Sequence, residues 1–151
     1  MSRRTEHAQA SRAPHGSALS GGQGDLRILA RARRLIGVRF RPQGRSAETG
    51  LDCIGLAAAA LRATDVPRDY ALRGGSAARL AEGLAAAGLR PVKSGRPGDL
   101  LVMAAGAGQL HLGIFTGDGL IHADAGLRRV VERPGEPPWP VLSIWRMKWR
   151  H

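Results

Sequence analysis

The spacing of hydrophobic and polar residues divides this chain into a helical first half and a second half made of strands. Apolar residues recur every three or four positions over residues 28–36, and again around Leu80 and Leu84. That spacing is typical of amphipathic helices. From residue 97 onward the pattern changes to short apolar runs separated by Gly and Pro, which predicts strands. Helices followed by strands indicate an α+β fold with an antiparallel sheet.

We expect a helix in three places. The first follows Asp25, which we predict to be its N-cap, and ends at Gly37. The second covers residues 52–63, with Asp52 as a natural N-cap, and is apolar on nearly every side, so it should be buried. The third covers residues 76–87.

The strand predictions begin after a Pro-Gly-Asp turn. Residues 38–51, which lie earlier in the chain, contain Pro and Gly and are expected to form a loop. The expected strands share short apolar runs bounded by turn residues, and they cover residues 100–103, 110–116, 119–124, 128–132 and 141–147.

Residues 1–24 are rich in Ser, Gly, Ala and Arg and show no hydrophobic periodicity. We therefore expect a disordered basic tail, followed by one domain over residues 25–151. No apolar segment follows the positively charged start, so no signal peptide is expected. No stretch approaches the length of a membrane span.

The formal net charge is +11, and arginine supplies nearly all of it. Such a charge suits anionic cell-wall polymers, nucleic acids or membrane surfaces. The arginines are scattered, however, and the densest cluster, over residues 27–36, is explained by an amphipathic helix. Because no basic patch with interleaved aromatic residues appears, we do not expect nucleic-acid binding to be the main role.

Cys53 is the only cysteine in the chain. At a helix start, a thiol lies beside unpaired backbone N–H groups and the positive end of the helix dipole, which favour the thiolate. Cys53 is therefore a candidate nucleophile, and the alternative is an inert cysteine buried in the core. No group of His, Cys and Asp residues has the spacing of a metal site, so neither a metal nor another cofactor is expected.

Two histidines, His111 and His122, lie on the two strands of a predicted hairpin. The run Thr-Gly-Asp-Gly at residues 116–119 predicts a tight two-residue turn. Counting back from this turn, Gly113 opposes His122 and His111 opposes Asp124. The two histidines then lie on one face as diagonal neighbours, about 7–8 Å apart at the backbone. His111 is a candidate general base, with either His122 or Asp124 as the group that orients it.

In these motifs the chain resembles the NlpC-type cysteine peptidases of bacterial cell-wall turnover. Their nucleophile motif usually reads Asp-Cys-Ser-Gly-Leu, and residues 52–56 read Asp-Cys-Ile-Gly-Leu. Their base motif follows Pro-Gly-Asp-Leu, as at residues 97–100, and reads His-Val-Gly-Ile-Tyr, against His-Leu-Gly-Ile-Phe at residues 111–115. A third polar residue, commonly histidine, corresponds to His122. The resemblance spans roughly residues 26–147.

The resemblance implies a reduced papain-like fold, in which helices pack on an antiparallel sheet. It implies that Cys53 is the nucleophile, His111 the general base and His122 its orienter, acting through a thioester. The implied substrate is the peptide stem of bacterial peptidoglycan, commonly the bond between D-glutamate and a diamino acid.

Two departures from that family lie close to the thiol. Many members have a tyrosine in the loop before the nucleophile, where this chain has Phe40 between Arg39 and Arg41. Ile54 stands where serine is usual. We expect Phe40, Arg39 and Arg41 to contact substrate. Arg39, Arg41 and Arg45 are expected near stem carboxylates, and the alternative is that these arginines are solvated loop charges.

The resemblance is strongest to the compact branch encoded with phage tails and gene-transfer agents, which often lacks a signal peptide. It implies synthesis in the cytoplasm, delivery in a phage-like particle, action at the cell wall, and phage-tail or gene-transfer-agent proteins as partners. The alternative function is a catalytically silent structural component of a phage-like tail.

The tryptophans near the C-terminus could form a surface for sugar rings or for a partner. Trp139 lies in a Pro-Pro-Trp-Pro run, and Trp145 lies within the last predicted strand. We expect packing rather than binding at these positions, with Trp145 in the core.

Overall fold

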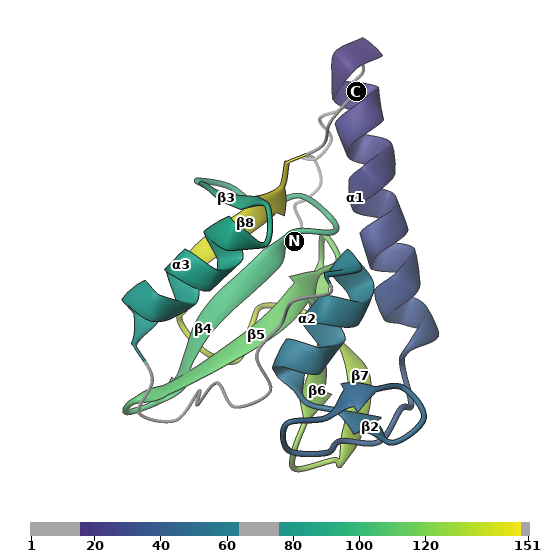
Figure 1. The fold of residues 1–151 in the computed structure, drawn as a ribbon, viewed down its shortest axis with the longest axis vertical. Coiled ribbons are helices and arrows are strands. Elements are labelled where there is room, and N and C mark those ends of the chain that lie inside the picture. Colours follow the sequence, from purple (N-terminus) through teal and green to yellow (C-terminus); the bar gives the residue numbers. More distant parts are fainter. Residues whose placement is uncertain (1–15, 64–75, 149–151) are drawn as a thin grey trace.

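The structure is a computed structural model of the 151-residue chain, and it describes residues 16–63 and 76–148. Within these residues, three helices pack on a six-stranded antiparallel sheet (Figure 1). Helix α1 spans Gly16–Arg34, α2 spans Cys53–Leu61 and α3 spans Ala77–Ala86. The α+β architecture expected from the sequence is confirmed.

The sheet has the strand order β3-β8-β4-β5-β6-β7. Neighbouring strands are antiparallel throughout. A separate short ribbon, β1 (Arg45–Ser46) and β2 (Gly50–Leu51), lies within the segment expected to be a loop. The strands of the sheet are β3 (Leu89–Val92), β4 (Leu100–Gly106), β5 (Gln109–Phe115), β6 (Gly119–Asp124), β7 (Arg129–Pro134) and β8 (Val141–Met147).

Helix α1 differs from its prediction at its start. It begins at Gly16 rather than after Asp25, so residues 16–24 of the expected tail are helical, while residues 1–15 lie outside the described part of the chain. Asp25 is a buried residue inside the helix rather than its N-cap. Gly98 packs against it so closely that a Cβ there would lie 2.2 Å from the Asp25 carbonyl oxygen.

The core has two parts because successive residues of a strand point to opposite faces. The larger cluster lies between the sheet and the helices and includes Ile28, Leu56, Leu100 and Ile114. The smaller cluster, on the other face, contains Leu101, Met103 and Leu120, with Trp139 packed against it. Trp145 is buried in the larger cluster, as expected. No helix among the described residues is long and apolar enough to cross a membrane.

A buried ion pair joins the start of β4 to β8. Asp99, from the Pro-Gly-Asp-Leu run, is 1% exposed. Arg146 Nε donates to Asp99 Oδ1 at 2.9 Å, and Arg146 Nη2 donates to Asp99 Oδ2 at 2.8 Å. The Arg96 backbone N–H donates to the same Oδ2 at 2.8 Å. This bidentate geometry fixes the turn that leads into the strand beside β5.

We predict that Arg146→Met lowers the free energy of unfolding by about 3–5 kcal/mol, because it leaves the Asp99 carboxylate buried without its cation. The matched control is Arg33→Met, which breaks an exposed pair with Glu132 and should cost no more than about 1 kcal/mol. Urea denaturation followed by circular dichroism measures both. Equal losses in the two variants would contradict a structural role for the buried pair.

Candidate active site

Cys53 is the first residue of α2, as predicted. Asp52 has extended backbone angles (φ −97°, ψ −170°) and its Oδ1 accepts a hydrogen bond from the Gly55 N–H at 2.8 Å. This is the geometry of an N-cap, and it satisfies one of the unpaired donors of the first turn. The Cys53 side chain that follows is buried, with 3% of the residue exposed.

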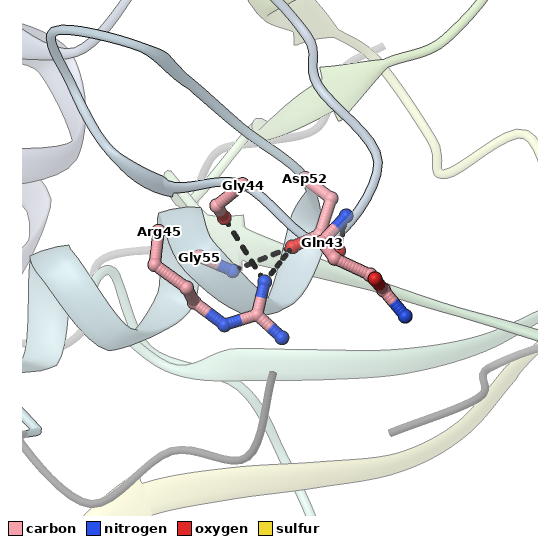
Figure 2. A network of polar contacts seen from close by, with 5 residues as sticks. All are labelled: Gln43, Gly44, Arg45, Asp52 and Gly55. Carbon is pink, nitrogen blue, oxygen red and sulfur yellow. Dashed lines mark hydrogen bonds and ion pairs between the residues drawn. The ribbon is translucent and has the colours of Figure 1, made fainter. Parts of the chain in front are cut away.

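Asp52 also fastens the preceding loop to the helix start (Figure 2). Its Oδ1 accepts a second hydrogen bond from Arg45 Nη1 at 2.7 Å, and its Oδ2 accepts from the Gln43 N–H at 3.0 Å. Arg45 Nη1 in turn reaches the Gly44 carbonyl at 2.9 Å. Both side chains of this ion pair are largely buried, so a single carboxylate holds the loop and the helix together.

Gly55, two positions after Cys53, is required because the preceding loop packs closely against the helix start. A Cβ at Gly55 would lie 2.0 Å from the Gly44 carbonyl oxygen and 3.1 Å from Leu51 Cδ2. No side chain fits there unless the loop moves away from the helix. The Gly in the Asp-Cys-Ile-Gly-Leu run is therefore explained by packing rather than by backbone conformation.

The predicted hairpin between the two histidines is confirmed. Strands β5 and β6 pair Ile114 with Ile121 and Phe115 with Leu120, and the Thr116 N–H donates to the Gly119 carbonyl at 2.9 Å. This is the register counted back from the turn. It brings the residues predicted to be diagonal neighbours onto one face.

His111 and His122 make direct contact. His111 Nε2 lies 2.9 Å from His122 Nδ1, and the two rings meet edge to face with centroids 5.1 Å apart. Asp124 does not face His111. Its Oδ2 lies 3.8 Å from His122 Nε2, so the carboxylate stands behind the second histidine. Of the two orienters considered for His111, the structure places His122 against it.

Trp139 completes this group, and its place was not predicted. Its ring centroid lies 4.9 Å from that of His111 and 5.7 Å from that of His122. Because β8 pairs with β4 rather than with β7, the segment between β7 and β8 must cross the sheet, and it carries Trp139 over the histidines. Only the strand order, which the local pattern does not encode, could have indicated this contact.

A pocket of about 550 Å³ opens beside the histidines. Its walls include both imidazoles, Trp139, Asp124 and Gln109. In the described part of the chain, no group of three or more His, Cys, Asp and Glu side chains could hold a metal ion.

Several solved structures share this arrangement of helices and sheet. The P60 domain of antigen MAP1204 from M. avium subspecies paratuberculosis is 22% identical over 85% of this chain and 96% of that one, with a TM-score of 0.58. The peptidoglycan hydrolase RipB from Mycobacterium tuberculosis is 20% identical over 92% of this chain and 74% of its own, with a TM-score of 0.56. This chain has the NlpC/p60 fold.

RipD from Mycobacterium tuberculosis has the same fold without catalysis. It is 17% identical over 82% of this chain and 96% of its own, with a TM-score of 0.53, and is described as a non-catalytic NlpC/p60 domain protein adapted to peptidoglycan binding. By sequence, no protein-family model and no curated protein matches the chain. The NlpC/p60 fold alone therefore does not decide between cleavage and binding.

Within this NlpC/p60 fold, the thiol lies against β5 on the face that packs on the helices. The Leu112 backbone makes a hydrogen bond that favours the Cys53 thiolate, and Leu112 directly follows His111. Among the described residues, His111 hydrogen-bonds to His122 and not to Cys53. Leu112 and Cys53 belong to the larger core cluster, whereas His111 pairs with Met103 and contacts Trp139 on the other face of the sheet. The structure therefore does not bring the predicted nucleophile and base into contact.

Burial determines the protonation states of the Cys53 thiol and the His111 imidazole. Burial raises the pKa of Cys53 to about 12, against the opposing effect of the Leu112 hydrogen bond. Burial, and then the neighbouring His122, lower the pKa of His111 to about 4, although Asp124 acts in the opposite direction. The prediction that the helix start favours a resting thiolate is wrong, because desolvation outweighs the hydrogen bonds from the backbone of Leu112 and of Cys53 itself. The resting site holds a neutral thiol and a neutral imidazole.

The residues expected to contact substrate lie in the segment between α1 and α2. Phe40 is partly buried against the larger core cluster, and its N–H donates to the Arg128 carbonyl at 2.9 Å. Arg39 Nε donates to the Thr49 carbonyl at 3.2 Å, and Arg41 is exposed. Ile54, the other departure, is buried and lines an apolar pocket of about 380 Å³ between α2 and α3.

We predict that Gly55→Ala disrupts the start of α2, because the new methyl group would overlap the Gly44 carbonyl. It should lower the free energy of unfolding by about 1–3 kcal/mol, the usual cost of overpacking. Gly83→Ala is the matched control, since nothing lies within 4 Å of a Cβ at this helical position. That control should stabilise the protein by up to about 1 kcal/mol. Thermal melts of both variants measure the difference, and a stable Gly55→Ala would refute the close contact.

We also predict that stability falls as the pH drops from 6.5 towards 4. The pKa of both histidines is lowered by burial, so the folded state binds fewer protons than the unfolded chain in this range. Their contribution is complete above pH 6.5 and is lost progressively below it, as the histidines of the unfolded chain protonate, until folded His111 also protonates near pH 4. Urea denaturation at a series of pH values should show this slope, and His111→Gln should make it shallower. An unchanged slope in that variant would contradict the burial of a neutral His111.

Proposed function

We propose that the protein is a cysteine peptidase that cleaves an amide bond in the peptide stem of bacterial peptidoglycan. In this proposal Cys53 is the nucleophile, His111 the general base and His122 the residue that orients it. The observation that carries it is the 2.9 Å contact between the two histidines, next to the strand residue whose backbone meets the Cys53 thiol.

In this proposal the two ring nitrogens of His111 have different roles. Its Nε2 hydrogen-bonds to His122, and Nδ1 is proposed to accept the thiol proton. As that proton leaves, Sγ attacks the amide carbonyl carbon and forms a tetrahedral intermediate. The amine leaving group takes the proton back from Nδ1, and the resulting thioester is hydrolysed by a water molecule that His111 activates in turn.

The first turn of α2 supplies a backbone N–H donor for the negative charges that form during the reaction. The Cys53 backbone N–H belongs to the donors that have no partner within the helix, and it favours the thiolate of its own side chain. The same N–H is a suitable oxyanion donor for the tetrahedral intermediate. Because both groups rest in their neutral forms, the proton transfer accompanies the attack instead of preceding it.

Peptidoglycan is proposed as substrate from the fold neighbours and the charge. RipB is a peptidoglycan hydrolase with the same fold, and a net charge of +11 complements an anionic polymer. The exposed Arg41 is proposed to meet a stem carboxylate, with Arg39 and Phe40 beside it. Action at the cell wall follows from this substrate, while delivery by a phage-like particle and partners from phage tails stay predictions of the sequence resemblance.

Binding without cleavage is the second candidate. The non-catalytic RipD supports it, since that protein keeps the fold for peptidoglycan binding. A silent structural part of a phage-like tail is a related alternative. The retained thiol and the paired histidines favour the enzyme over both.

We predict that the purified protein releases soluble fragments from peptidoglycan sacculi and that Cys53→Ala releases them at least about 10³-fold more slowly, the scale seen when a catalytic nucleophile is removed. Mass spectrometry of the fragments identifies the bond cleaved. Cosedimentation with sacculi is the control, and both forms should bind equally. Equal background release by both forms, with binding retained, would overturn the enzyme in favour of a binding protein.

A further inference from the structure

One ring nitrogen of His122 is buried, and neither Cys53 nor His111 of the proposed triad bonds to it. The residue is 1% exposed, and its Nδ1 is taken by His111. Its other ring nitrogen, Nε2, is buried and has no hydrogen-bond partner among the described residues. Leaving a buried donor unpaired costs about 1–3 kcal/mol, so this nitrogen calls for an acceptor.

The chemistry of His111 decides which nitrogen of His122 carries the proton. His111 can accept the thiol proton at Nδ1 only when its own hydrogen is on Nε2. That N–H then donates to His122 Nδ1, which must be unprotonated. The hydrogen of a neutral His122 therefore sits on Nε2, the unpaired atom.

The structure assigns Asp124 as the acceptor and hence as a positioning residue for the histidine pair, an inference that rests on the proposed function. Asp124 Oδ2 lies 3.8 Å from His122 Nε2. Its other oxygen, Oδ1, accepts the Leu127 N–H at 3.0 Å, which keeps the carboxylate turned towards the histidine. A small side-chain rotation brings Oδ2 to the usual N–H···O distance of about 2.9 Å.

Through this contact, Asp124 fixes the tautomer of His122 and, through it, the tautomer of His111. Asp124 itself does not touch the reacting atoms. Asp124 holds the hydrogen of His122 on Nε2, so Nδ1 of His122 accepts from His111. His111 then keeps its hydrogen on Nε2 and presents Nδ1 as a base. Without the carboxylate, the proton shared by the two rings is free to sit on His122 Nδ1, which leaves His111 with the wrong tautomer.

The charges around the pair fit this role. Asp124 on β6 raises the pKa of both histidines, whereas Arg133 on β7 lowers that of His122 and His122 lowers that of His111 on β5. When His111 becomes positive during the attack, Asp124 is the nearby negative charge that stabilises it.

Asp124→Asn tests the inference with little structural change, because the Asn Oδ1 can still accept the Leu127 N–H while its amide group cannot accept from His122. Asp118→Asn is the matched control, since Asp118 is exposed on the turn of the same hairpin and its Oδ1 accepts a hydrogen bond from the Thr116 hydroxyl. The measurements are the kcat and KM for released muropeptides and the ¹⁵N chemical shifts of the histidine rings across a pH titration.

We expect Asp124→Asn to lower kcat by about 10- to 100-fold with little change in KM, as when other groups that orient histidines are removed. The same variant should lower the pKa of His111 and His122 and move the hydrogen of His122 off Nε2. Asp118→Asn should change none of these. The inference is overturned when Asp124→Asn matches Asp118→Asn in both kcat and ring ¹⁵N shifts.

The two proposals fail in different ways. A wild-type protein that does not cleave peptidoglycan but shows His122 protonated on Nε2, with the proton displaced in Asp124→Asn, overturns the proposed function and supports the positioning role. A wild-type protein that cleaves peptidoglycan while the rings of Asp124→Asn keep their tautomers overturns the positioning role alone.

Discussion

The position of the thiol depends on how the first turn of α2 is held. One carboxylate, Asp52, caps the helix and accepts hydrogen bonds from Gln43 and Arg45 of the preceding loop. The loop can come this close only because Gly55 has no side chain. These contacts hold the helix start where the buried Cys53 thiol meets the Leu112 backbone of β5. A helix start is mobile when uncapped, so this rigidity is what makes a fixed nucleophile possible.

Burial of the site has two opposing effects. It removes water from the thiol and imidazoles, which keeps both groups neutral and lowers the pKa of His111. It also strengthens each remaining polar contact, since electrostatic interactions grow as the local dielectric constant falls. The contact between His111 and His122 and the edge-to-face packing of Trp139 then fix the base in one orientation. A neutral but ordered site suits general base catalysis, in which the proton moves only when a carbonyl group is in place.

Local patterns in the sequence were sufficient for the parts of the site that neighbouring residues determine. The cap at Asp52 and the pairing of His111 with His122 follow from helix-start chemistry and from the two-residue periodicity of a hairpin. The pattern failed where distant segments meet. One such place is the contact of Trp139 with the histidines, which depends on the order of strands in the sheet. The pattern also missed the first turns of α1, which extends back to Gly16. The pKa of Cys53 was misjudged for the same reason, because burial depends on the whole fold while the helix dipole is local.

The most direct measurement of the central claim, that Cys53 carries the acyl group during cleavage, is intact-mass spectrometry of acid-quenched reactions. The substrate should be a stem peptide with a good leaving group at the scissile bond, so that deacylation becomes the slow step and the intermediate accumulates. We expect an added mass equal to the acyl half of the substrate, mapped to Cys53 and absent from Cys53→Ala. Turnover without any adduct on Cys53, and retained in Cys53→Ala, would contradict the claim.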